Sequence, residues 1–278
     1  FEAEIIDGVI YGRGALDMKC LGIMQLMSLI LLKREGYMPE RTIKFLGVAD
    51  EEILGQYGVQ WMIENHWDKL DPEWVWDEGG IGSTDSFPDL SAFAIAVAQR
   101  KSFWVDIEVV GKSGHGSRPF KDYSNEILAK ALNNIVSWET SIDINPVISE
   151  MFYRIGNHMG GLEGFIMKNI DNSLIKYFFG NTVASSSTST NAMLRNTVAL
   201  TMIESGYKTN IIPEKAKASL DIRLLPHISP DKFLNDLKLV VDDDRVKFMP
   251  KRIPTNNFVS NWDTDFFSIL SEELNNEK

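Results

Sequence analysis

The sequence lacks several features that would assign it to common classes of protein. It has one cysteine, Cys20, among 278 residues, which excludes an internal disulfide. It has no repeat at a fixed period, which argues against a solenoid. Its longest apolar run, Leu21 to Leu32, is interrupted by Gln25 and Ser28 and is shorter than the roughly 18 residues of a membrane-spanning helix. We therefore expect no membrane span.

Basic residues are outnumbered by acidic ones. The chain has 28 Lys and Arg against 39 Asp and Glu, a net charge of -11, so neither nucleic acid nor an anionic membrane surface is expected as a partner. The hydrophobic content of 44% is enough for two moderate cores, which favours two domains. The chain begins at Phe1 and not at Met, so we expect the true N-terminus to lie upstream. A cytoplasmic location is expected.

The sequence does contain a run of three carboxylates, Asp50, Glu51 and Glu52, directly after the mostly apolar segment 43–48. Like charges at this spacing repel one another and raise each other's pKa values, so something must compensate them. In open α/β sheets ligand sites form at the carboxyl ends of strands. A metal ion is the commonest compensation for clustered acids. A solvated acidic turn is the alternative interpretation.

Further acids occur in similar settings. Asp17 follows the glycine-containing stretch 11–16, and Asp77 and Glu78 precede Gly79 and Gly80. Each set of acids lies beside glycines and after apolar residues, as expected if all of them converge at the ends of neighbouring strands. A carboxylate that lies beside a metal-bound water, and is not itself a ligand, is suited to act as a general base.

Five motifs occur in the order found in a large family of zinc-dependent amidohydrolases. They are GRGALDMK at 12–19, DEE at 50–52, DEGG at 77–80, GHGSRP at 114–119, and NIIP at 210–213 with DIR at 221–223. The ordered set covers most of the chain and resembles the family of aminoacylase-1, carboxypeptidase S, glutamate carboxypeptidase and succinyl-diaminopimelate desuccinylase. The aminoacylase-1 and carboxypeptidase S branches are the most similar, because both use an Asp-Glu-Gly form of the third motif.

The resemblance implies a centre with two zinc ions, or with cobalt or manganese in their place. Asp17 would bridge the two ions, Glu52 would bind one of them and Glu78 the other. Asp77 could exchange roles with Glu78. Glu51 would take the proton from the bridging water and return it to the leaving amine. The implied substrate is a small peptide or an N-acyl amino acid.

The resemblance also implies residues outside the metal centre. His115 resembles the residue that stabilises the tetrahedral oxyanion, in related dimers at the site of the neighbouring subunit, which implies a homodimer through the lid domain. Asn210 and Arg223 resemble residues near the substrate, and Arg223 would pair with a free carboxylate through its guanidinium.

Two elements of the family pattern are missing from the sequence. The family carries a His-x-Asp motif upstream of the segment that matches 12–19 and a metal-binding histidine near its C-terminus, and neither is present here. The alternative function is therefore a catalytically incomplete fragment or homologue that acts as a binding or dimerisation module. We expect the chain as it stands to bind zinc poorly, because three carboxylates alone do not select zinc.

Residue periodicity predicts the elements. Helices are expected at 18–35, 57–66, 122–140, 230–241 and 263–273, and strands at 41–48, 90–97, 103–110, 197–203, 216–224 and 245–248. Segments 111–119 and 185–190 are expected to be loops, and 156–161 a turn. From 103 to 248 the order of elements is ferredoxin-like. We expect an α/β fold, with a three-layer αβα catalytic domain formed by 1–99 and 254–278 and an inserted ferredoxin-like lid formed by 100–253.

Overall fold

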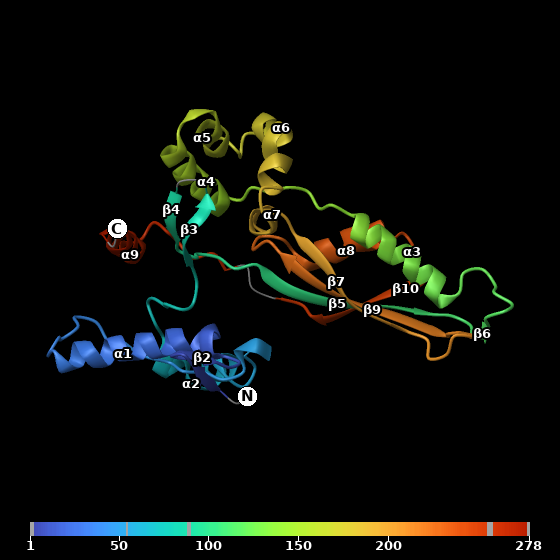
Figure 1. Cartoon of the computed structure of the whole chain (residues 1–278), viewed down its shortest axis with the longest axis horizontal. Helices are drawn as coiled ribbons and strands as arrows, with labels where there is room; N and C mark the ends of the chain where they lie inside the picture. Colours follow the sequence, from blue (N-terminus) through green and yellow to red (C-terminus); the bar gives the residue numbers. More distant parts are fainter. Residues whose placement is uncertain (1–2, 54, 88–89, 255–257, 277–278) are drawn as a thin grey trace. The chain divides into compact units, whose positions relative to one another are not determined.

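The computed structural model describes residues 3–53, 55–87, 90–254 and 258–276. The chain divides into two compact units, Phe1–Gly80 and Ile81–Lys278 (Figure 1).

A four-stranded antiparallel sheet forms the centre of the second unit. Its strand order is β10-β5-β9-β7, with β5 (Lys101–Val110) and β9 (Lys215–Leu224) in the middle and β7 (Thr197–Ser205) and β10 (Val246–Arg252) at the edges. The helices α3 (Ser124–Ser137) and α8 (Pro230–Val241) complete the chain order strand, helix, strand, strand, helix, strand. The predicted ferredoxin-like fold of this region is confirmed.

The core of this unit lies between the sheet and its two helices, which Figure 1 shows along the sheet. Strand β9 alternates buried and half-buried residues along its length, as a strand with one covered face must. Its buried side chains, from Ala216 to Leu224, pack with those of β5, α3 and α8. Helix α8 begins where the sequence predicts, because the Ser229 side chain accepts a hydrogen bond from the amide of Lys232 and Pro230 occupies the first turn.

Four helices lie between α3 and β7. They are α4 (Pro146–Met159), α5 (Gly161–Lys168), α6 (Ser173–Ala184) and α7 (Thr188–Leu194), and they bury a second apolar cluster that includes Phe152, Ile170 and Leu194. The prediction of a turn at 156–161 is wrong in its first part, since α4 continues to Met159. The prediction of a loop at 185–190 is wrong from Thr188 onwards, where α7 begins.

Gly156 and Gly164 lie where α4 and α5 pack against each other. A Cβ atom at Gly156 would lie 2.5 Å from the carbonyl oxygen of Gly164, so the absent side chains allow α4 and α5 to approach closely. The turn itself falls at Gly160 and Gly161, which both have a positive φ, of 67° and 61°.

A buried arginine closes the base of this helical insertion. Arg195 is 5% exposed, and it donates hydrogen bonds to the carbonyl oxygen of Thr140 (2.6 Å) and to Asn181 Oδ1 (2.5 Å). The Thr140 hydroxyl donates to the carbonyl oxygen of Asn196 (2.6 Å). The chain therefore enters and leaves the insertion at adjacent points.

The second unit also contains β3 (Ile81–Phe87) paired with β4 (Leu90–Ala94), and the helix α9 (Asp265–Asn276). Strand β4 begins where the strand 90–97 was predicted but ends three residues earlier, and α9 corresponds to the helix predicted at 263–273.

The first unit contains the hairpin β1 (Glu4–Ile6) and β2 (Val9–Tyr11) and the helices α1 (Leu21–Arg34) and α2 (Val59–Leu70). The strand predicted at 41–48 is wrong, because this segment has no ladder partner in the part of the chain that the structure describes. Its polar side chains reach the end of α2 instead. Arg41 pairs with Glu73, and Lys44 Nζ donates to the carbonyl oxygens of Lys69 (2.6 Å) and Leu70 (3.0 Å).

Helix α1 buries none of its residues. Together with the segment Ala15–Cys20 that precedes it, it forms a stretch, Ala15–Arg34, whose most apolar 18-residue window has a mean hydropathy of 1.6. By length and composition this stretch is sufficient to cross a membrane, a test that the core helix of a soluble protein also passes. The expectation of no membrane span therefore stays a prediction.

Candidate functional site

Four of the acidic residues singled out in the sequence act on a fifth, Glu78, in the first unit. Partial burial raises the pKa of Glu78 above its ordinary value, and the negative charges of Asp17, Asp77, Glu51 and Glu52 raise it further, in that order. Each of these four carboxyl groups therefore lies within electrostatic reach of Glu78. The structure brings the predicted acids into one region, although their separation in the sequence is large.

Asp50 differs from Glu51 and Glu52 because hydrogen bonds tie it to the backbone of the loop that follows. Its Oδ2 accepts a hydrogen bond from the amide of Tyr57 (2.8 Å), and its carbonyl oxygen accepts from the amides of Ile53 and Gly55. A Cβ atom at Gly58 would lie 2.6 Å from Asp50 Oδ1, so glycine is needed where the loop meets this carboxylate. Asp50 thus shapes the loop, a role that the sequence analysis did not assign.

Glu51 and Glu52 are left exposed in the short 3₁₀ turn Glu51–Ile53 that follows Asp50. Asp17 lies in the segment before α1, with non-helical φ and ψ of -109° and 99°, and its peptide bond to Met18 is cis. It precedes α1, which begins at Leu21 and not at residue 18 as predicted.

In the third acidic motif, the carboxylates of Asp77 and Glu78 differ in their hydrogen bonds. Asp77 Oδ1 accepts a hydrogen bond from the backbone amide of Glu78 (2.8 Å), so the Asp77 carboxylate turns back onto the chain. No corresponding bond engages the Glu78 carboxylate among the residues that the structure describes.

The acidic side chains of the described residues carry the negative charge that a divalent cation requires, but their present arrangement does not form a binding site for one. Carboxylates whose charges act together on Glu78 are the environment that a hard cation neutralises. Within the described ranges, however, no three His, Cys, Asp or Glu side chains lie close enough together to hold a metal ion. His66, the histidine of the first unit, instead packs edge-on against the ring of Trp61 at 4.9 Å.

His115 lies in a short strand, which corrects the prediction that 111–119 is a loop throughout. Strand β6 (Gly114–His115) pairs with β8 (Ile211–Ile212), and the amide of Gly116 donates to the carbonyl oxygen of Asn210 (2.8 Å). A Cβ atom at Gly116 would lie 3.3 Å from the Asn210 backbone, so glycine permits this approach. The structure therefore places His115 next to Asn210.

The imidazole of His115 contacts one side chain two residues further on. Its Nδ1 accepts a hydrogen bond from the amide of Ser117 (3.2 Å) and lies 2.8 Å from Ser117 Oγ. The carbonyl oxygen of His115 accepts from the amide of Arg118 (2.9 Å), which closes the turn that follows. The side chain of His115 is exposed.

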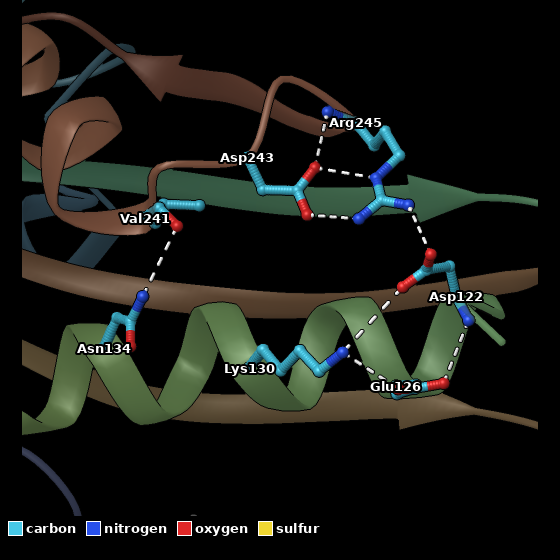
Figure 2. Close-up of polar contacts among 7 residues, drawn as sticks. All are labelled: Asp122, Glu126, Lys130, Asn134, Val241, Asp243 and Arg245. Atoms are coloured by element: carbon cyan, nitrogen blue, oxygen red, sulfur yellow. Dashed lines mark hydrogen bonds and ion pairs between the residues drawn. The ribbon is translucent and has the colours of Figure 1, made fainter.

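The segment that carries His115 is anchored where it enters α3. Figure 2 shows Asp122 between two cations, Lys130 Nζ at 3.8 Å and Arg245 at 3.5 Å, while its amide donates to Glu126 Oε2 (3.0 Å). Arg245 also pairs with Asp243. The hydrogen bonds that Arg245 donates hold the pKa of the Asp243 carboxyl group below its usual range. Asp122 has a φ of 61°, a conformation that aspartate tolerates better than most residues. This anchor was not predicted from the sequence.

Arg223 lies at the other end of the lid sheet from His115. In the ladder between β5 and β9, Arg223 pairs with Ser102, and its guanidinium donates to Ser102 Oγ (2.6 Å) and to Asp221 (2.9 Å). Strand rise puts Arg223 about 26 Å from Lys215, the end of β9 nearest to β8. One subunit's lid therefore does not bring Arg223 and His115 together.

With this geometry in hand, comparison with known proteins assigns the chain to a family. Residues 97–248, more than half of the chain, match the family model of the M20 peptidase dimerisation domain. The chain belongs to the M20 peptidase family, as its motifs indicated. The matched region contains the lid sheet and the helical insertion.

Individual relatives show the same kinship. An N-fatty-acyl-amino acid synthase/hydrolase of Xenopus tropicalis is 31% identical over 262 residues, which cover 89% of this chain and 48% of that protein. Aminoacylase-1 of Sus scrofa is 29% identical over 233 residues, 84% of this chain and 46% of that protein. The chain thus spans about half the length of the curated relatives it matches.

A solved structure supports the fold. A tripeptidase from Staphylococcus aureus aligns with 99% of this chain and 59% of its own length, at a TM-score of 0.58 and 17% sequence identity.

Proposed function

We propose that this chain is part of a metal-dependent hydrolase. The hydrolase cleaves the amide bond of a small peptide or an N-acyl amino acid. The observation that carries the proposal is the electrostatic coupling of Glu78 to Asp17, Asp77, Glu51 and Glu52. A cluster of acids this costly is maintained when it has a cation to bind. The printed names of the relatives, a synthase/hydrolase of acyl amino acids and an aminoacylase, support the same bond type.

In this proposal Asp17, Glu52 and Glu78 hold two zinc ions, or cobalt or manganese, together with ligands from outside the chain. When bound, the ions would activate a water molecule and polarise the substrate carbonyl. Glu51 accepts the proton of the attacking water and passes it to the leaving amine. The hydrogen bond from the Glu78 amide to Asp77 supports Glu78 as the ligand, since it leaves the Glu78 carboxylate available.

The test compares two neighbouring glutamates in the full-length protein. Glu51→Gln is expected to lower turnover by about 10² to 10⁴ with metal content unchanged, because a general base is removed and no ligand is lost. The matched variant Glu52→Gln is expected to lose metal first. Turnover and metal analysis after dialysis measure both. Loss of metal in Glu51→Gln would move Glu51 into the ligand set.

We further propose that His115 donates a hydrogen bond to the oxyanion in the active site of a neighbouring subunit, with Asn210 beside it and Arg223 near the substrate carboxylate. Its distance from Arg223 within one lid supports action across a dimer. His115→Ala is expected to lower kcat by about 10² to 10³ with KM and metal little changed. Mixed dimers of His115→Ala and Glu51→Gln subunits are expected to regain activity. Inactive heterodimers would place His115 in its own subunit's site.

The edge strands support dimerisation through β7. The β10 edge contains Pro250 and the basic residues Lys247 and Lys251, all of which discourage pairing with another strand. The β7 edge has no proline and no basic residue, and its Met202 and Ile203 are 50% and 61% exposed. An antiparallel β7 to β7 contact would extend both sheets by a two-fold axis.

This interface is tested by placing a charge on either edge. Ile203→Lys is expected to convert the dimer to a monomer in analytical ultracentrifugation, because it puts like charges opposite each other across the two-fold axis. Met249→Lys on β10 is the matched control and is expected to leave the dimer intact. A dimer that survives Ile203→Lys would exclude the β7 edge.

A second candidate function is a dimerisation module without activity of its own. The arrangement of the described acids, which forms no group of three ligands, favours it. Stoichiometric zinc retained by the purified chain after dialysis would contradict the module. Turnover of Glu51→Gln in the full-length protein distinguishes the two: a fall of about 10² to 10⁴ supports the hydrolase, and unchanged turnover assigns this chain the role of a module.

A further inference from the structure

We propose that Ser117 is a positioning residue that holds His115 in the tautomer whose proton is on Nε2. The inference rests on the proposed function, in which His115 donates a hydrogen bond to an oxyanion. Ser117 keeps the proton of the imidazole on Nε2, so that this nitrogen can donate a hydrogen bond.

The contacts at Nδ1 define the tautomer. The amide of Ser117 lies 3.2 Å from Nδ1 with the geometry of a donated hydrogen bond, and a backbone N–H cannot accept one. Nδ1 is therefore the acceptor. Ser117 Oγ, 2.8 Å from the same nitrogen, donates its hydroxyl proton in this arrangement. In the neutral ring the one remaining proton belongs on Nε2.

The outward nitrogen is free to bind a ligand. Within the ranges that the structure describes, no protein group forms a hydrogen bond with Nε2 of His115, and the side chain is exposed. An oxyanion requires an N–H donor at about 2.7 to 3.1 Å, which the Nε2 tautomer supplies. The opposite tautomer would present a lone pair to the negative charge and repel it.

The backbone around Ser117 is fixed by other contacts, so the ring and the serine keep their relative position. The amide of Gly116 is bonded to Asn210 in the β8 segment, and the amide of Arg118 is bonded to the carbonyl oxygen of His115. The ladder to β8 thus holds the backbone of the turn while Ser117 holds the imidazole.

A spectroscopic test reads the tautomer without activity. In ¹⁵N-histidine-labelled chain, a long-range ¹H–¹⁵N spectrum shows which ring nitrogen is protonated in each of the four histidines, and the His115→Gln variant identifies the His115 signals. The wild type is expected to show protonated Nε2. Ser117→Ala keeps the amide contact at 3.2 Å but loses the shorter hydroxyl contact at 2.8 Å, so it is expected to show a larger fraction of the Nδ1 tautomer. Ser117→Thr, which keeps the hydroxyl, is expected to restore the wild-type spectrum.

The control removes a hydroxyl from the same segment without touching the ring. Ser113 Oγ donates to the carbonyl oxygen of Ile212 at 3.0 Å, so Ser113→Ala loses a comparable hydrogen bond. Its His115 signals are expected to match those of the wild type. A change in Ser113→Ala equal to that in Ser117→Ala would reduce Ser117 to a general structural role and overturn the proposal.

Turnover of the full-length protein provides the second readout. Ser117→Ala is expected to lower kcat about 3- to 10-fold with little change in KM, the effect of one neutral hydrogen bond. In a His115→Ala background the same substitution is expected to have no further effect, because Ser117 acts through His115.

The outcomes separate this inference from the function on which it rests. Protonated Nδ1 in the wild type, or an unchanged spectrum and kcat in Ser117→Ala, overturns the role of Ser117. Full turnover in His115→Ala instead overturns the oxyanion role, because alanine has no donor, and the measured tautomer is unaffected by that result.

Discussion

The two units of the chain both contain strands and helices, but they bury their apolar side chains very differently. In the lid, Ile222 on β9 is 0% exposed and Phe103 on β5 is 1% exposed. In the first unit no apolar side chain of the described residues is buried, and Ile23 and Trp76 are 61% and 68% exposed. Every strand of the lid sheet has a neighbour, and α3 and α8 pack against the sheet, whereas α1 in Phe1–Gly80 buries none of its residues.

This comparison shows what an alternating pattern can and cannot specify. Segment 103–110 and segment 41–48 both read as strands, yet only the first has strands on both sides. Backbone N–H and C=O groups of a strand require partners, so a strand forms where the fold provides them.

Separation of the two units should produce the largest difference. The fragment 81–278 is expected to unfold in one cooperative transition, because it contains the lid core and the helical cluster. The fragment 1–80 is expected to show no cooperative transition and to bind a hydrophobic dye. Circular dichroism and dye fluorescence during denaturant titration measure this. A cooperative transition in 1–80 would contradict the exposure of its apolar side chains and show that this fragment has a core of its own.

A pair of matched truncations sharpens the contrast within the intact chain. Ile222→Ala is expected to lower the free energy of unfolding of the lid by about 2 to 5 kcal/mol, since it leaves a cavity in a closed core. Ile23→Ala removes the same atoms from an exposed side chain and is expected to change stability by about 0.5 kcal/mol or less. The denaturant midpoints of the two variants measure these losses of stability. Equal losses at the two positions would contradict the difference in burial.

A smaller effect is expected from the open face of the lid sheet, where one aspartate interrupts the alternation of β5. Asp106 is 5% exposed and contacts Lys217 Nζ (2.7 Å), Lys251 Nζ (2.9 Å) and Ser219 Oγ (2.7 Å). Burial alone would raise its pKa, but hydrogen bonds to Lys217, Ser219 and Lys251 outweigh it and hold the pKa at about 2, below the ordinary 3.8.

The pH dependence follows from the sign of that shift. A carboxyl group with a depressed pKa stabilises the fold above its unfolded pKa, so the contribution of Asp106, about 2 kcal/mol, is present at neutral pH and is lost as the pH falls from about 4 to about 2. The stability difference between wild type and Asp106→Asn is therefore expected to shrink over this interval. Ile222→Ala, with no ionisable group changed, is the control whose deficit should not follow this titration.

Sequence reasoning located what local chemistry determines. The helix that starts at Pro230 was predicted because Ser229 and the proline lie beside it, and the acids from Asp17 to Glu78 were grouped by their repeated setting. Three of the helices in the insertion carried a similar signal that was not used: Asn145, Asn172 and Ser187 each accept an amide hydrogen bond at a helix start.

The rest depended on distant partners. The strand at His115 exists because Ile211 lies opposite it, nearly a hundred positions away, and no local pattern records such a pairing. Asp50 and Asp77 read as site residues, but backbone amides hold their carboxylates. The sequence did not separate these structural acids from Glu51, Glu52 and Glu78 because all five have the same chemistry.

The clamp of Arg195 at the base of the helical insertion also affects how quickly the lid can fold. Sheet formation must close the long loop between Ser137 and Thr197, and such non-local closures slow folding. Because Arg195 and Thr140 join the two ends of the insertion, helices that form early shorten the path that the remaining chain must search. Loop entropy rises by only about 0.6 kcal/mol per doubling of length, so an insertion closed at its base adds little to the folding barrier. Stopped-flow refolding of Arg195→Ala, which loses the bonds of the arginine but keeps the one between Thr140 and Asn196, would register the share of the arginine as a slower rate of sheet formation.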